Sequence, residues 1–229
     1  MILSHRHQFI FLKTNKTAGT SLEIALAQMC GPDDVITPVS PKDEELRKSL
    51  GIRGPQNYAP AFSEYSRRDW FTTVRRLKRK RFFNHMPARE VKQLVSQDLW
   101  QNYFKFCFER NPWDRMLSLY AWRCQTEPKP TLSEFIDSRA ARDLTRRGIE
   151  VYTIDGQVVV DRVCRYENLD AELQFLQERL ELPEPLLLPH AKASHRTDRR
   201  HYREIFQPHE ADKINDLFYR EISLFGYTF

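Results

Sequence analysis

The stretch QFIFLKTNKTAGTS at residues 8–21 decides the fold, because it joins a short apolar run to a polar loop and the start of a helix. The run at 8–12 is typical of a buried strand, and the pattern after the loop is helical until Gly31. Thr20 and Glu23 have the spacing of a capping box, which predicts that the helix begins here. Backbone N–H groups and the helix dipole favour an anion at such a junction, so the stretch predicts an α/β fold with a phosphate-type site.

A second junction of the same kind, YFKFCFERNPWDRMLS, occupies residues 103–118. Aromatic residues and alternation predict a strand at 103–109, and Asn111 followed by Pro112 predicts the start of a helix. Arg110 leaves the end of this strand, and Ser118 lies two turns into the helix. Either residue alone is interpreted as an ordinary surface cation or a helix-face hydroxyl, and both junctions lie at the ends of predicted strands.

The remaining patterns surround these junctions with further elements. They predict helices at 41–50, 67–80, 88–99, 168–180 and 209–224, a strand at 81–83 before His85, and a hairpin that turns at Asp155 and Gly156. Strands that lead into helices imply a central, mainly parallel sheet flanked by helices, with ligands at the carboxyl ends of the strands. The whole chain, 1–229, is expected to be a single domain, in which 31–80 is a variable insertion.

The composition, with 41% hydrophobic and 29% charged residues, is that of a soluble globular protein. The apolar run that ends at Lys13 is too short for a signal-peptide core or a membrane span, so we expect a cytoplasmic protein without a membrane span. The four cysteines form no CxxC pair and have no metal-ligand spacing. This pattern predicts buried free thiols and no metal site.

The positive charge of the chain is concentrated in one segment. The net charge is +5, whereas residues 64–81 contain eight basic and two acidic residues, a local charge of +6. Such a segment suits an anionic ligand, whether nucleic acid, acidic glycan or nucleotide. A basic run is also a common solvated face, and that interpretation stays open.

Taken together, the motifs NKTAGTS (15–21) and FERNPWDRMLSLY (108–120) resemble the paired cofactor motifs of the sulfotransferases that use 3′-phosphoadenosine 5′-phosphosulfate (PAPS). The likeness is to the carbohydrate-type branch, similar to sulfotransferase family 2. The segments NHMPAREV, CRYENL and REISLFGYTF match as well. The resemblance implies a P-loop-like sulfotransferase fold and transfer of a sulfuryl group to an acceptor hydroxyl, with 3′,5′-ADP (PAP) as product. Asn15 departs from the family, which has Pro there to stiffen the loop entry.

The resemblance also implies roles for individual residues. Lys16 would stabilise charge on the leaving oxygen, His85 would be the general base, and Arg110 and Ser118 would hold the 3′-phosphate. The 5′-phosphosulfate would be held by the loop residues Lys16, Thr17, Ala18, Gly19, Thr20 and Ser21. No metal is required, because the sulfuryl group carries less charge than a terminal phosphate. With a pKa near the usual 6.5 or lower, His85 would accept the hydroxyl proton, and a structural histidine stays open as the alternative.

Other segments receive broader expectations. Lys192, Ser194 and Arg196 lie in a basic loop that aligns loosely with one that closes over the cofactor, and a solvated surface loop is an equal alternative. Glu167 is interpreted as structural, because it leads into Asn168 as a helix cap. The insertion at 31–80, with its basic segment, is expected to face the acceptor, which is a carbohydrate or glycoconjugate rather than a nucleic acid.

Two other functions remain as alternatives. A P-loop nucleotide kinase would use QVVVD at 157–161 as a strand that ends in a metal-binding Asp, but its loop, GxxxxGK[ST], has Lys after the last Gly, whereas Lys16 precedes Gly19. A non-catalytic protein could bind acidic polysaccharide or nucleic acid through 64–81. That function gives no reason for two phosphate-type sites.

Overall fold

The computed structural model describes the chain from 1 to 229 except residues 61, 63–64, 66, 77–78, 190–197 and 199. Its strands are β1 (Ile2–Ser4), β2 (Phe9–Phe11), β3 (Val35–Ile36), β4 (Phe104–Glu109), β5 (Thr153–Ile154), β6 (Gln157–Val158) and β7 (Arg162–Arg165). Its helices are α1 (Gly19–Gln28), α2 (Pro41–Ser49), α3 (Arg67–Arg76), α4 (Ala88–Leu94), α5 (Gln97–Asn102), α6 (Pro112–Arg123), α7 (Leu132–Ile136), α8 (Arg139–Glu150), the 3₁₀ helix η2 (Tyr166–Asn168), α9 (Leu169–Arg179), α10 (Tyr202–Ile205), α11 (Pro208–Leu217) and α12 (Tyr219–Phe225).

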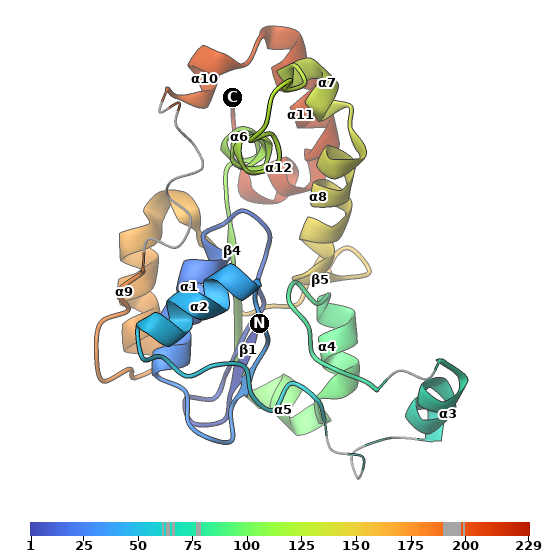
Figure 1. Ribbon diagram of the computed structural model, residues 1–229, viewed down its shortest axis with the longest axis vertical. Helices are drawn as coiled ribbons and strands as arrows, with labels where there is room; N and C mark the ends of the chain where they lie inside the picture. The colour runs from blue at the N-terminus through green and yellow to red at the C-terminus, as the bar shows by residue number, and fades with distance from the viewer. Residues whose placement is uncertain (61, 63–64, 66, 77–78, 190–197, 199) are drawn as a thin grey trace.

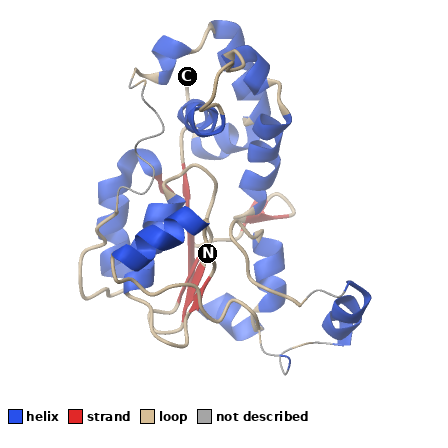
Figure 2. Cartoon of the chain, in the orientation of Figure 1, coloured by secondary structure: helices blue, strands red, loops and turns tan. Residues whose placement is uncertain are grey.

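Five strands form one sheet in the order β3-β1-β2-β4-β7, in the middle of the molecule (Figure 2). The strands β2, β4 and β7 are parallel, and in this register Phe9 pairs with Phe104 and Phe106 with Arg162. The strands β1 and β3 are added antiparallel. The predicted α/β fold is confirmed, with the correction that the sheet is mixed, because the chain begins with the hairpin β1–β2.

Alternating side chains of the strands bury both faces of the sheet. Phe9, Phe11 and Phe106 pack on one face, under α1 and α9, while Ile10 and Cys107 pack on the other, under α4 and α5. A third apolar cluster joins α6, α7, α8, α10, α11 and α12, which gather at one end of the sheet (Figure 1). Since β4 leads directly into α6, the second junction lies between the sheet and this helical cluster.

Most predicted elements are confirmed, including the strand and helix at each junction, the helix at 41–50 and the hairpin at Asp155. The predicted helix at 88–99 is divided into two, because Ser96 caps a new helix by accepting a hydrogen bond from the N–H of Leu99. The predicted helix at 209–224 is likewise divided, at Phe218.

The predicted strand at 81–83 is wrong. These residues form no strand; the backbone N–H of Phe82 donates to the carbonyl oxygen of Tyr58 at 2.7 Å, and Phe82 alone of the three is buried. The apolar residues at 81–83 therefore provide one buried side chain, that of Phe82, where the chain returns to the position of Tyr58. The segment between Tyr58 and Phe82 contains α3, which stands away from the other helices (Figure 1).

Candidate active site

The loop between β2 and α1 has the backbone shape of an anion-binding loop. Lys16 and Ala18 have positive φ angles of 65° and 56°, and alternation of left- and right-handed residues turns successive N–H groups toward one concave side. The loop also curls tightly over Lys13, because a Cβ at Gly19 would lie 2.7 Å from Cγ of Lys13. The loop therefore has the backbone shape that the predicted phosphate-type site requires, and its anion binding stays a prediction.

The predicted capping box at Thr20 and Glu23 is wrong. The helix begins after Ala18 without a side-chain cap, and the carboxylate of Glu23 is buried against the Lys13 ammonium, with Oε2 2.7 Å from Nζ, and against the α-ammonium of Met1. Burial by itself would raise the pKa of Glu23, but the two cations hold it at about 2. Glu23 thus stays ionised and anchors the start of the loop from below.

The hydroxyls of the loop are partly used to hold the loop itself. Thr17 Oγ1 lies 2.8 Å from Thr14 Oγ1, and Thr14 Oγ1 donates to the carbonyl oxygen of Phe108 at the end of β4. Thr20 and Ser21 lie in the first turn of α1 and are buried. The Thr17 hydroxyl, a predicted cofactor contact, is therefore linked through Thr14 to the neighbouring strand β4. The groups whose orientation suits an anion are the backbone N–H groups of the loop.

The second junction meets the first one at Lys16. Arg110 Nη1 donates to the carbonyl oxygen of Lys16 at 3.2 Å, and the Lys16 ammonium lies 5.1 Å from the ring centre of Trp122 on α6. Arg110 is held by Asp114, whose Oδ2 accepts from Nε at 2.8 Å and from Nη2 at 2.6 Å. The structure thus brings together the two sites that the sequence predicted separately.

Ser118 lies on the same face of α6 as these contacts. Asp114, Ser118 and Trp122 are spaced four residues apart, so they form one stripe along the helix. Asp114 contacts Arg110 at the beginning of the stripe, and Trp122 contacts Lys16 at its end. Ser118 is therefore placed between the two cations that the sequence predicts to bind the cofactor. Asp114 and Trp122 were not predicted; their spacing from Ser118 was the available signal.

His85 lies at the entry of the loop. Its Nδ1 is 2.9 Å from the carbonyl oxygen of Lys13 and, since a carbonyl only accepts, Nδ1 carries the proton and the neutral ring keeps a lone pair on Nε2. Burial lowers the pKa of His85 to about 3, helped by the Lys13 ammonium. The pKa therefore lies far below 6.5, and burial lowers it more than the neighbouring cation does.

Glu167 has the contacts of a structural residue. Its Oε1 accepts from the backbone N–H of Asn111 at 2.5 Å, and its Oε2 from the Tyr227 hydroxyl at 3.4 Å. It therefore fixes the β4–α6 corner. Asn168 precedes α9 as predicted, but its side chain makes no capping hydrogen bond.

The structure describes only part of the two remaining segments, the basic loop with Lys192 and the basic segment at 64–81. Lys192, Ser194 and Arg196 lie outside the described residues. In the basic segment, Arg67 and Arg75 on α3 are exposed, Trp70 stacks on Phe62, and Phe71 is 66% exposed. This helix stands apart from α6 in Figure 1.

Asp161, the metal ligand of the kinase alternative, lies at the wrong edge of the sheet. It directly precedes β7, and its carboxylate accepts from the backbone N–H of Lys105 near the start of β4. Because β2, β4 and β7 are parallel, this edge is opposite to the one where the phosphate loop follows β2. The kinase alternative is contradicted at this point.

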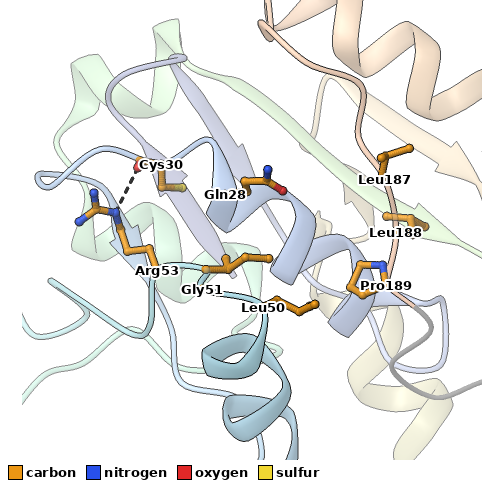
Figure 3. A pocket seen from close by; sticks show the side chains of 9 residues that line it. Gln28, Cys30, Leu50, Gly51, Arg53, Leu187, Leu188 and Pro189 are labelled. Carbon is orange, nitrogen blue, oxygen red and sulfur yellow. Dashed lines mark hydrogen bonds between the residues drawn. The ribbon is translucent and has the colours of Figure 1, made fainter.

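A cavity of about 650 Å³ lies beside the far end of α1 (Figure 3). Cys30, Leu50, Arg53 and Leu188 are among its lining residues, and Arg53 Nε donates to the carbonyl oxygen of Cys30 at 3.2 Å. The phosphate-type loop precedes the opposite end of α1. The cavity is therefore separate from the candidate site.

Within the described part of the chain, no group of three His, Cys, Asp or Glu side chains could hold a metal ion. The same residues include no helix long and apolar enough to cross a membrane. All four cysteines are free thiols, as predicted, and Cys124 alone among them is not buried.

Comparison with known proteins gives two matches. A sequence model described as the Sulfotransferase family matches residues 1–228, a range that includes both junctions. An uncharacterized protein of Archaeoglobus fulgidus is 33% identical over 106 residues, which are 44% of this chain and 87% of that protein. No solved structure matches the chain.

Proposed function

Because this chain belongs to the sulfotransferase family, a family of PAPS-dependent transferases, we propose that it transfers the sulfuryl group of PAPS to a hydroxyl of a carbohydrate or glycoconjugate. The observation that carries the proposal is the contact between Arg110 and the carbonyl of Lys16. It joins an anion-shaped loop to a second cationic junction in one site, as a donor with phosphates at both its 3′ and 5′ positions requires.

The chain supplies charge and position for the transfer. Lys16 and the loop amides would bind the 5′ group, and the Lys16 ammonium would offset the charge that develops on the leaving oxygen. Arg110, already oriented by Asp114, and Ser118 would bind the 3′-phosphate. These residues fit the donor because the loop has two left-handed residues and a cation on its rim.

His85 would receive the proton of the acceptor hydroxyl. Its Nδ1–H is directed to the Lys13 carbonyl, so the lone pair on Nε2 is the one that can accept. Lys13 is also the first residue of the loop, which links the base to the donor site. The acceptor O–H bond would break as its oxygen bonds to sulfur, and the bond between sulfur and the 5′-phosphate oxygen would break, with PAP as the leaving group.

The donor assignment is tested by thermal shift with the unmodified protein. PAP without any divalent metal should raise the unfolding temperature more than ADP does, since only PAP engages Arg110 and Ser118. ATP with Mg²⁺ is the comparison for the kinase, and a shift with a heparin-like oligosaccharide but none with PAP would favour the non-catalytic binder. Equal shifts for PAP and ADP would contradict the 3′-phosphate site.

For the acceptor, we propose an extended sugar chain whose distal part contacts the basic helix α3. The exposed Arg67 and Arg75 support this, as does the position of α3 away from the loop (Figure 1). The double variant Arg67→Gln/Arg75→Gln should raise the acceptor KM and reduce its salt dependence. Arg139→Gln/Arg146→Gln, on exposed positions of α8, is the matched control. An unchanged KM would make α3 a solvated face.

A further inference from the structure

Arg115 is a buried cation in the middle of the site that the proposed function does not use. It lies on α6 with 0% exposure, and its Nη1 is 2.5 Å from Oε1 of Glu109, which is equally buried at the end of β4. A buried ion pair is weak evidence for a stabilising role, because desolvation offsets the attraction. The role of Arg115 therefore depends on which other groups it holds in place.

Nε of Arg115 contacts the phosphate-type loop. It donates to the carbonyl oxygen of Asn15 at 2.9 Å, and Arg110 holds the next carbonyl, that of Lys16. In a trans peptide the C=O and N–H bonds point in opposite directions. Two arginines that hold these consecutive oxygens therefore turn the amides of Lys16 and Thr17 toward the other side of the loop. This orientation accompanies the positive φ of Lys16.

Arg115 is itself fixed on several sides. Glu109 holds Nη1, and α8 packs so closely that a Cβ at Gly148 would lie 2.7 Å from Nη2. Glu109 Oε1 also accepts from the backbone N–H of Arg110 at 3.0 Å, so the same carboxylate orders both arginines.

We propose that Arg115 is a positioning residue for the donor: it holds the Asn15 carbonyl so that the loop amides and Lys16 face the 5′-phosphate. This role rests on the proposed function, because it takes the 5′ end of the nucleotide to bind in the loop. Arg115 acts through the backbone, and its buried side chain has no direct access to a ligand.

The test separates the two ends of the nucleotide by calorimetry with 5′-AMP, 3′-AMP and PAP. The variant is Glu109→Gln/Arg115→Met, because removal of the guanidinium alone would leave a buried carboxylate unpaired. Gln at 109 keeps an acceptor for the Arg110 N–H. We expect the affinity for 5′-AMP and PAP to fall about tenfold, with the affinity for 3′-AMP unchanged. Arg110→Met is the comparison variant: it should weaken 3′-AMP, which the double variant spares, and it should weaken 5′-AMP as well because it releases the Lys16 carbonyl.

General loosening of the fold would weaken all three nucleotides alike, and that result, or unchanged 5′-AMP affinity, would overturn the role of Arg115. If the double variant does not fold, Gly148→Ala is measured in its place. The added methyl displaces Nη2 without removing a charge, and the same loss confined to 5′-AMP and PAP is expected. If the unmodified protein binds no PAP, the proposed function is contradicted. If the unmodified protein binds PAP and the variants bind PAP and 5′-AMP equally well, only the role of Arg115 is contradicted.

Discussion

Nη1 of Arg110 donates to the carbonyl oxygen of Lys16 across 94 positions of sequence, at a distance of 3.2 Å. The guanidinium also lies 4.2 Å from the ring centre of Tyr166 and is paired with Asp114. Arg110 therefore has a fixed direction before any ligand binds. Pre-orientation of this kind reduces the entropy that the Arg110 side chain loses when a ligand binds, so its removal should lower the affinity for a 3′-phosphate.

Replacement of Arg110 by Ala should weaken PAP binding by about 1.5–3 kcal/mol, because the 3′-phosphate loses a charged donor. ADP, which has no 3′-phosphate, should lose much less. Calorimetric titration of both nucleotides checks this. If PAP affinity is unchanged, Arg110 only links the loop to the β4–α6 corner.

Lys16→Ala should lower turnover by on the order of 10²–10³, because charge grows on the leaving oxygen in the transition state. Binding of the product PAP should change by less than tenfold. Trp122→Leu is the control, since it removes the aromatic ring 5.1 Å from the ammonium but keeps the cation. Near-normal turnover of Lys16→Ala, measured with saturating donor, would refute the role.

His85→Asn should reduce turnover by on the order of 10²–10⁴ while PAP still binds. With its pKa at about 3, His85 is unprotonated above pH 5 in the free protein, so its NMR signals should not titrate near 6.5. The folded state binds this proton less tightly than the unfolded chain, so stability should rise with pH from about 3 to 6.5. Titration of the His85 ring near 6.5, or full activity of the variant, would place the base elsewhere.

Glu221 should make the protein less stable as the pH rises. Burial raises the pKa of this α12 carboxyl to about 7, with Arg115 opposing and Glu109 adding to the shift. The folded state therefore binds the proton more tightly than the unfolded chain, and stability falls between about pH 4.5 and 7.

Glu221→Gln should consequently be more stable than the unmodified protein at pH 8, by on the order of 1–3 kcal/mol, and equal to it near pH 4. Urea unfolding at several pH values measures this, with Glu150→Gln, an exposed carboxyl on α8, as control. Parallel pH curves for the two variants would show that Glu221 titrates normally.

Local patterns were enough to predict both junctions. The cap at Asn111, with Pro112 after it, depends on residues adjacent in sequence, and Asn111 Oδ1 accepts from the N–H groups of Trp113 and Asp114 as the pattern requires. The sequence also predicted that both junctions lie at carboxyl ends of strands, but it did not predict the contact between Lys16 and Arg110.

Tertiary contacts account for what was missed. Glu23 has capping-box spacing, but a buried ammonium on Lys13 competes for its carboxylate more strongly than a backbone N–H does. Arg115 carries no sequence signal for burial, because arginine on a helix is usually exposed and its enclosure depends on groups far away in the sequence, such as Asn15 and Gly148. Local spacing cannot report either contact.

The close approach of Gly19 to Lys13 has an evolutionary consequence. A methyl group at 19 is excluded by the Lys13 side chain rather than by the backbone angles of the glycine, since its Cβ would lie 2.7 Å from Cγ of Lys13. Relatives that have no Cγ at position 13 would lose the tightest of these contacts, and Ala at 19 would then meet only the carbonyl oxygen of Thr14, at 3.2 Å. Substitutions at the two positions are therefore expected to occur as pairs among descendants of a common ancestor.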